Sequence, residues 1–280
     1  MIERIEIALP VAPGTVNVFL IPIESGHMLI DCGMTTPPPG LPGDIRQIAI
    51  THAHPDHCGG AARVRDQTGA PLLMHWREAA TLAGLRDAEG WLEREERTLT
   101  RAGVPEPMRR RFQTAALRIR RFFPNAAADG LLQDGDTIPT ALGPMRVIHT
   151  PGHAAGHLCF YFPERRLLIS GDQLVEHQAP HIDLDAGANA LDQYRESLHR
   201  LARLDAGWVY PSHGAPFQGH RERIAALLEH CNNKAGDIRR WRAAGFHTAH
   251  ELAIGYWGRP MNPFEHRCAV REMMCYMEQE

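Results

Sequence analysis

Several features that point to export, membranes or a disulfide framework are missing from this sequence of 280 residues. No stretch has about 18 uninterrupted apolar residues, so we expect no membrane-spanning helix and no membrane partner. The first residues, MIERIEIALPV, lack a basic segment followed by a long apolar one, so we expect no signal peptide. Six cysteines are scattered along the chain and none forms a C-x-x-C pair. Together these absences predict a cytoplasmic protein with reduced thiols.

A strong excess of charge of one sign is also missing. The chain has 30 lysines and arginines and 33 acidic residues, and the net charge of -3 gives no overall positive field that would attract nucleic acid. A G-x-S-x-G motif is absent, which excludes the class of serine hydrolase that carries its nucleophilic serine in this motif. Apolar residues make up 44% of the chain, enough to build the core of one large domain or of a large and a small one.

Apolar runs of strand length alternate with helical segments up to Gly219, which predicts an α/β domain over residues 1–219. Between Trp76 and Phe123 the periodicity becomes helical and charged, so we predict a helical insert of two or three helices over 76–123. The remainder of the chain, 220–280, has mostly helical periodicity and predicts a small C-terminal helical unit.

The stretch THAHPDHCGG, residues 51–60, follows an apolar run and concentrates three histidines and one aspartate. His52 and His54 are two positions apart on an extended segment, so both imidazoles can point at one cation. Pro55 turns the chain, and Asp56 and His57 after it can face a second cation. This pattern favours a metal site over an ordinary solvated loop.

Three further polar clusters also follow predicted strands. TPGHAAGH supplies His153 and His157, SGDQ supplies Asp172, and YPSHG supplies His213. Because α/β folds place their sites at strand ends, we expect these side chains to meet the first cluster there.

These motifs, in this order, resemble the metallo-β-lactamase superfamily of hydrolases, and the resemblance covers roughly Val16 to Gly219. It implies a four-layer αβ/βα sandwich with the site at one edge of two packed sheets. The C-terminal unit weakly resembles the winged-helix-like unit of a branch that includes a lactamase-like endoribonuclease. Carried over by motif, the implied metal ligands are His52, His54 and His153 for the first ion, Asp56, His57 and His213 for the second, and Asp172 between them.

The resemblance implies two divalent metal ions, with zinc as the default and iron or manganese as alternatives. Two such ions can hold a hydroxide between them, and Asp56 would orient this nucleophile and shuttle its proton. We also name His157 as a catalytic candidate, through contact either with the ligand shell or with substrate. The alternative for His157 is a structural role.

Two functions fit this chemistry. The first is hydrolysis of a small-molecule acyl bond in a thioester, ester or lactone. The alternative is a phosphodiesterase or endoribonuclease acting on nucleic acid, which the arginines and phenylalanines of RRRFQTAALRIRRFF, residues 109–123, would favour. The same stretch also fits a solvated helix whose arginines pair with the acidic helix before it. A non-catalytic relative and a single-iron sulfur oxygenase remain further readings, and the sequence leaves the oligomeric state open.

The insert leaves and rejoins the chain near the ligand clusters, so we expect it to cover the metal cleft as a lid. The apolar residues expected to turn inward are Trp91, Leu92, Leu99 and Phe112. Outside the ligand set, we expect His149 to be a hydrogen-bonded core residue and Cys58 a small packing residue. His177 and His181 fit either a pocket wall or the surface.

Overall fold

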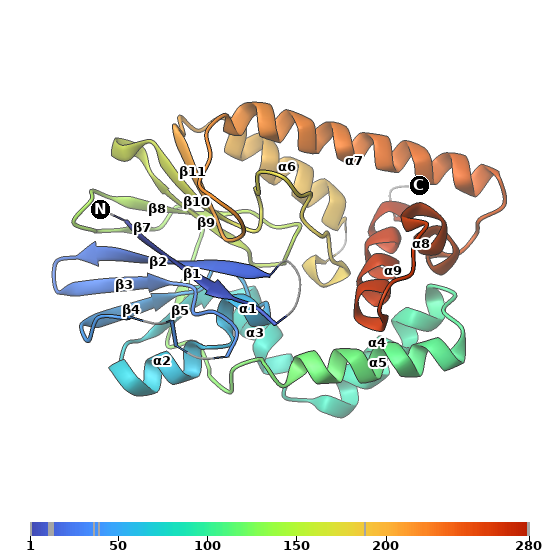
Figure 1. Cartoon of the computed structure of the whole chain (residues 1–280), viewed down its shortest axis with the longest axis horizontal. Coiled ribbons are helices and arrows are strands. Elements are labelled where there is room, and N and C mark those ends of the chain that lie inside the picture. The colour runs from blue at the N-terminus through green and yellow to red at the C-terminus, as the bar shows by residue number, and fades with distance from the viewer. Residues whose placement is uncertain (1, 11–13, 36, 39, 188, 279–280) are drawn as a thin grey trace.

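The computed structural model describes residues 2–10, 14–35, 37–38, 40–187 and 189–278. Two β-sheets lie face to face at its centre (Figure 1). The first sheet begins with antiparallel strands and continues with parallel ones, in chain order. Its strands are β1 (Glu3–Ala8), β2 (Thr15–Ile23), β3 (Gly26–Ile30), β4 (Ile45–Ala49), β5 (Leu72–His75) and β6 (Gly130–Leu132).

The second sheet has the order β11-β10-β9-β8-β7. Only β10 and β11 pair in parallel, while the other neighbours are antiparallel. Its strands are β7 (Thr137–Ile138), β8 (Met145–His149), β9 (Leu158–Phe162), β10 (Leu167–Gly171) and β11 (Trp208–Pro211).

The alternation of β2 shows how the layers form. Phe19 and Ile21 point to one face and pack against Phe160 and Phe162 of β9, which forms the core between the two sheets. Their neighbour Leu20 points to the opposite face and packs with residues of the helical layer there. Both faces are buried, as the nearly continuous apolar run of this strand requires.

Helices cover the two outer faces (Figure 1). On the first sheet these are α1 (Pro55–Cys58) and α2 (Ala61–Thr68), and on the second they are α6 (Ala190–Ala202) and α7 (His220–Ala243). Two 3₁₀ turns, η1 (Pro163–Arg165) and η2 (Leu184–Ala186), complete the connections. The four-layer αβ/βα sandwich is thereby confirmed.

The expected insert contains three helices, α3 (Trp76–Gly84), α4 (Ala88–Arg101) and α5 (Glu106–Arg120). After α7 the chain ends in α8 (Ala249–Trp257) and α9 (Pro263–Met277), each begun by a capping box. Residues 220–278 contain helices and no strand, so this segment is helical but has no wing of strands. The domain boundary at 219/220 stays a prediction, and one apolar cluster joins α6 to α7, α8 and α9 across it.

Candidate metal centre

The seven expected ligands all lie just beyond the carboxyl ends of strands, where the two sheets share an edge. Segment 52–57 follows β4, and the other three clusters follow β8, β10 and β11. The structure brings the seven side chains together in two groups. The first group is His52, His54, His153 and Asp172, and the second is Asp56, His57 and His213.

Three ring nitrogens converge in the first group. His52 Nε2 lies 2.9 Å from His54 Nδ1, and His153 Nε2 lies 3.1 Å from each of them. Burial is the largest factor that lowers the pKa of all three histidines, that of His153 to about 3. Neutral rings direct lone pairs toward this common point, which is the donor arrangement that a transition metal requires.

The opposite nitrogens of two of these rings have partners that fix the tautomer. His153 Nδ1 donates to the backbone oxygen of His181 at 2.7 Å. The Thr51 hydroxyl donates to Asp31 at 2.8 Å, so its oxygen can accept from His52 Nδ1 at 3.1 Å. Each bond leaves Nε2 unprotonated and turned toward the centre.

The second group follows the same rule. His57 Nδ1 donates to Asp31 Oδ2 at 2.8 Å, and His213 Nδ1 donates to the backbone oxygen of Thr15 at 2.7 Å. Their Nε2 atoms point toward carboxylates, since His57 Nε2 lies 3.6 Å and His213 Nε2 3.4 Å from Asp56 Oδ2.

Asp172 lies between the two groups. Its Oδ1 is 3.4 Å from His57 Nε2 and 3.3 Å from His213 Nε2, while its Oδ2 is 3.5 Å from His153 Nε2. One carboxylate oxygen therefore faces each group. This arrangement would allow the carboxylate of Asp172 to contact two cations, one in each group.

The local potential favours positive charge. Burial alone would lower the pKa of His213, but the carboxylates of Asp172 and Asp56 outweigh it and raise this pKa to about 10. The pKa of His57 is raised in the same way by Asp172, Asp56 and Asp31 against the effect of burial. A divalent cation in the second group would be stabilised by the same carboxylates.

The donor set fits two transition-metal ions. A tetrahedral zinc centre with bonds of about 2.0–2.1 Å separates its ligand atoms by roughly 3.3 Å, which is close to the spacings within both groups. His57 Nε2 and Asp172 Oδ1 are buried without a hydrogen-bond partner among the described residues. Coordination would satisfy both atoms, since a buried polar atom without a partner is costly.

His157 lies behind the centre. Its Nδ1 contacts the Thr150 hydroxyl at 2.8 Å, and its Nε2 accepts a 3.1 Å hydrogen bond from the backbone N–H of Asp172. A Cβ at Gly171, which has φ +55°, would lie 2.4 Å from His157 Nε2, so glycine is required there. His157 is fully buried and is not among the residues of the cavity wall. Its contact is with the backbone of a ligand residue.

Two buried carboxylates, Asp31 and Glu78, support the ligand groups and were not predicted from the sequence. Asp31, in the left-handed region with φ 60°, accepts from Thr51 and His57 and so orients ligands of both groups. Glu78 in α3 accepts 2.6 Å hydrogen bonds from the backbone N–H groups of Ala53 and Gly156. It therefore connects the two loops that carry the first ligand group. The motif DCG marks Asp31, but no local pattern distinguishes Glu78 from a surface residue of an amphipathic helix.

Both ligand groups open into a cavity of about 750 Å³. His54, Asp56, His153, Asp172 and His213 lie in its wall. Most of the other lining side chains are apolar, and the larger ones come mainly from the insert, from the loop after β10 and from the C-terminal segment. They include Leu85, Trp91, Ala116, Ile119, Phe123, Val175, Trp257, Met261 and Phe264.

The insert therefore helps to cover the metal cleft, as expected for a lid, but with partly different residues. Trp91 lines the cavity. Leu99 and Phe112 do not, because both are buried in the apolar core that α4 and α5 share with α8 and α9. Leu92 is half-buried outside the cavity wall. The sequence could not show that the C-terminal helices cover this face of the insert.

The arginines of the insert are mostly turned away from the cavity. Arg109 pairs with Glu96 of the preceding helix at 2.7 Å, and Arg110 pairs with Glu106 at 2.7 Å. Of the six arginines in 109–121, only Arg120 belongs to the cavity wall. The expected pairing with the acidic helix is confirmed for Arg109.

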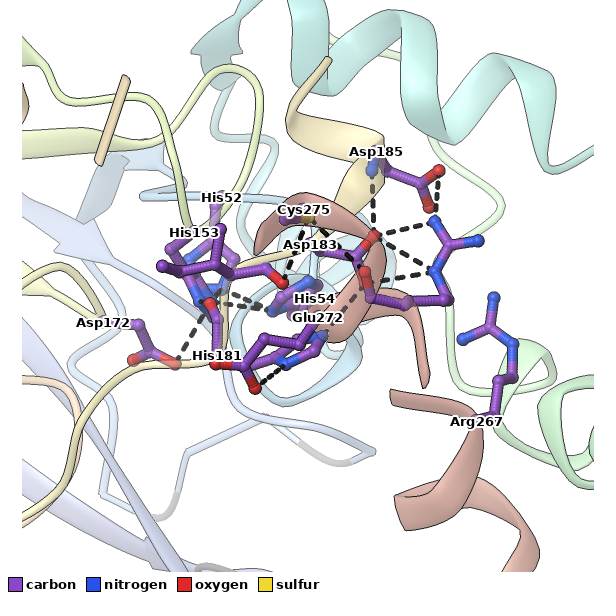
Figure 2. A network of polar contacts seen from close by, with 12 residues as sticks. His52, His54, His153, Asp172, His181, Asp183, Asp185, Arg267, Glu272 and Cys275 are labelled. Atoms are coloured by element: carbon purple, nitrogen blue, oxygen red, sulfur yellow. Dashed lines mark hydrogen bonds and ion pairs between the residues drawn. The ribbon is translucent and has the colours of Figure 1, made fainter. Parts of the chain in front are cut away.

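A buried network of charges borders the first ligand group (Figure 2). The His181 ring contacts Asp183 and Glu272, each at 3.2 Å, and Lys234 contacts Glu272 at 2.7 Å. Arg271 of α9 pairs with Asp183 at 2.7 Å. The loop whose backbone holds His153 is thus anchored to α7 and α9.

Three other histidines and Cys58 were assigned roles from the sequence. His149 is half-buried, contacts the backbone oxygen of Ala155 through its Nε2 at 2.9 Å, and stacks on His75. His181 is part of the cavity wall, whereas His177 is exposed. Cys58 is fully buried, as expected for a packing residue, and all six cysteines are unpaired.

A four-layer αβ/βα sandwich with two His/Asp groups at one sheet edge defines a metal-dependent hydrolase. The model of the "Metallo-beta-lactamase superfamily" matches residues 11–213, and the chain belongs to this superfamily.

Individual relatives agree with this assignment. The chain is 33% identical over 213 residues to the acyl-coenzyme A thioesterase MBLAC2 of Gallus gallus, covering 73% of this chain and 68% of that protein. It is 27% identical over 270 residues to the lactamase-like protein aptB of Emericella nidulans, covering 86% and 68%. The crystal structure of the metallo-beta-lactamase family protein TTHA1429 from Thermus thermophilus superposes with a TM-score of 0.86 at 28% identity, covering 99% and 92%.

None of the helices in the described part of the chain is both long enough and apolar enough to span a membrane.

Proposed function

We propose that this protein hydrolyses the acyl bond of a small-molecule thioester with two divalent metal ions. One observation carries the proposal: the two ligand groups open directly into a cavity of about 750 Å³ whose walls are mainly apolar. Such a cavity suits an acyl group with an apolar tail. Esters and lactones are hydrolysed by the same attack on an acyl carbon, so they are the alternative substrates.

In this proposal His52, His54 and His153 hold the first ion, and the second group, Asp56, His57 and His213, holds the other. Asp172, whose two oxygens face the two groups, would contact both ions. When bound, the two ions supply a hydroxide nucleophile at neutral pH and polarise the acyl oxygen. Zinc is the first candidate for mixed histidine and carboxylate ligands, with iron and manganese as alternatives.

Asp56 would orient the attacking water. Its side chain is 21% exposed and lies in the cavity wall. Burial raises its pKa, but His57 and His213 outweigh this and lower it to about 2, so the group is an anion at neutral pH. An anionic oxygen there can accept a hydrogen bond from the nucleophile and turn its lone pair toward the substrate.

His157 would act as a positioning residue, because it accepts from the backbone N–H of Asp172. Trp91, Ile119 and Phe264 would surround the acyl tail and exclude water from the reacting bond.

Two observations favour the thioester over a phosphodiester. The relative MBLAC2 is named as an acyl-coenzyme A thioesterase. A nucleic-acid backbone needs a cationic groove, whereas the arginines of the cavity wall, Arg120, Arg259 and Arg267, are outnumbered there by carboxylates.

The test is turnover of a panel of acyl thioesters, esters, lactones and phosphodiesters by metal-loaded protein. We expect the thioesters to be hydrolysed fastest, whereas a preference for phosphodiesters would overturn the proposal. Ala116→Trp fills the cavity and should raise KM for long acyl chains more than for short ones. Leu117→Trp, at a 40% exposed neighbouring position of α5, is the matched control.

A further inference from the structure

A second cavity of about 500 Å³ lies beside α3 and α4. Thr81, Leu85, Trp91 and Asp185 line both this cavity and the larger one at the metal site. The two cavities are therefore adjacent.

One wall of the second cavity is a row of arginines on α4. Arg94, Arg97 and Arg101 are spaced i, i+3 and i+7, so they share one helix face and all line this cavity. The helical rise of about 1.5 Å per residue places them roughly 4.5 and 6 Å apart along the axis. We call this row the α4 arginine face.

These guanidinium groups are only loosely paired. Their side chains are 52%, 69% and 66% exposed, and their carboxylate partners Asp87, Glu93 and Glu278 lie 3.9, 3.7 and 3.8 Å away. Within the described chain no hydrogen bond from these three side chains is present. Exposed pairs at such distances are weak, so the donors can be redirected to a stronger anion.

The acidic side chains of the second cavity are already neutralised by other arginines. Glu95 accepts from Arg267 at 2.6 Å and 2.9 Å, and Asp185 pairs with Arg271 at 2.6 Å. Arg94, Arg97, Arg101 and Arg271 line the second cavity against the two acidic residues Glu95 and Asp185, so its wall has an excess of positive charge, which the weak pairs with Asp87, Glu93 and Glu278 offset only in part. This charge selects for a ligand segment with several negative groups.

We propose that the α4 arginine face binds the phosphates of a nucleotide acyl carrier of the coenzyme A type. The acyl group would occupy the larger cavity, the thioester would face the metal groups, and the carrier would leave through the second cavity. This inference rests on the proposed function and names its substrate class. Arginine suits the role because its planar fork binds phosphate oxygens in pairs.

A series of thioesters with one acyl group tests the inference: acyl-pantetheine without phosphate, acyl-4′-phosphopantetheine with one, and acyl-coenzyme A. We expect kcat/KM to rise about 10-fold along the series, mainly through KM, since each exposed charge contact contributes modestly. The triple variant Arg94→Gln, Arg97→Gln, Arg101→Gln should abolish this rise and leave hydrolysis of acyl-pantetheine unchanged. Added salt should also weaken the preference.

Arg110→Gln is the matched control, because Arg110 is 72% exposed on α5, is paired with Glu106 and lines neither cavity. Calorimetric binding of coenzyme A itself gives a measurement independent of turnover, and the triple variant should bind it about 10-fold more weakly.

The outcomes separate the two proposals. Equal kcat/KM across the series, or a phosphate preference that survives in the triple variant, would overturn the inference while the thioesterase function stands. A preference that stops at 4′-phosphopantetheine would also overturn it and indicate a carrier protein. If no thioester is hydrolysed, the proposed function fails, and loss of coenzyme A binding in the triple variant still decides whether the arginine site exists.

Discussion

Glu78, in the first helix of the insert, accepts a 2.6 Å hydrogen bond from the backbone N–H of Gly156, three residues after His153. Its other carboxylate oxygen accepts from Ala53, between His52 and His54. One buried side chain of the insert thus fixes the spacing of the two loops that deliver the first ligand group. The insert contributes to the metal centre as well as covering it.

Glu78→Gln tests this connection. An amide has one acceptor oxygen where the carboxylate has two, so one loop loses its partner. We expect metal affinity in the first group to fall about 10-fold, which is typical for a residue that orients ligands. Competition with a chromophoric chelator measures the change. Glu89→Gln, an exposed change in α4, should leave the affinity unaltered.

Metal content tests the two-group geometry. Protein reconstituted with zinc should contain two ions per chain by elemental analysis, and His57→Ala should contain about one, because the second group then keeps two of its own ligands besides Asp172. Wild-type protein that saturates at one ion would contradict the assignment. Removal of metal by a chelator should abolish hydrolysis, and added zinc should restore it.

Asp56→Ala and His54→Ala should each lower hydrolysis by at least about 100-fold without unfolding the chain, because each removes a ligand and Asp56 also orients the nucleophile. Circular dichroism checks the fold, and kcat/KM measures the loss. Near wild-type turnover of either variant at full metal occupancy would refute its role.

Acid stability depends on Glu272. Burial raises the pKa of this carboxyl, but Lys234 and His181 outweigh it and lower the pKa to about 2, against roughly 4.3 in an unfolded chain. The stabilisation is therefore complete above about pH 4.3 and is lost as the pH falls toward 2. Glu272→Gln lacks this charge, so its deficit in unfolding free energy should be largest near pH 6 and shrink toward pH 2.5. Chemical denaturation at a series of pH values measures it.

The control for this titration is Glu229→Gln, an exposed position of α7. Its difference from wild type should be small and independent of pH, since surface charges contribute little. A deficit of Glu272→Gln that stays constant down to pH 2.5 would show that Glu272 is not held as a buried anion.

Much of this fold could be predicted from the sequence because its strands are strongly apolar. The sequence of β2, TVNVFLIPI, is one of the apolar runs of strand length, and all seven expected ligands meet at the strand ends. The strands β6 and β7 were not predicted, because segments of three and two residues carry no measurable alternation. Strand β1 was likewise not predicted, because half of its six residues are charged and none of them is fully buried.

The supporting residues were beyond sequence reasoning for a different reason. Glu78 acts on two loops through backbone N–H groups, which every residue type but proline can donate. A Cβ at Gly156 would lie 2.9 Å from Glu78 Cγ, but a glycine in a turn does not reveal which side chain packs against it. Leu99 and Phe112 were expected at the cavity because the insert leaves and rejoins the chain near the ligand clusters, but both lie in the apolar core shared with α8 and α9. Which face of a helix is covered depends on α9, a segment more than 150 positions away, and periodicity alone cannot specify that partner.

The ion pair between Glu95 of α4 and Arg267 of α9 joins two buried side chains that lie 172 positions apart in the chain. Glu95 is the only carboxylate among the described residues that pairs with Arg267, so the charge of Arg267 would lack a partner in the interior without it, whereas Glu95 also contacts Arg271 at 3.3 Å. The two segments must therefore be inherited together. A chimera that takes α4 from one relative and α9 from another should be less stable where it joins an arginine at 267 to a residue at 95 that is not acidic, so change at either position is constrained by the other.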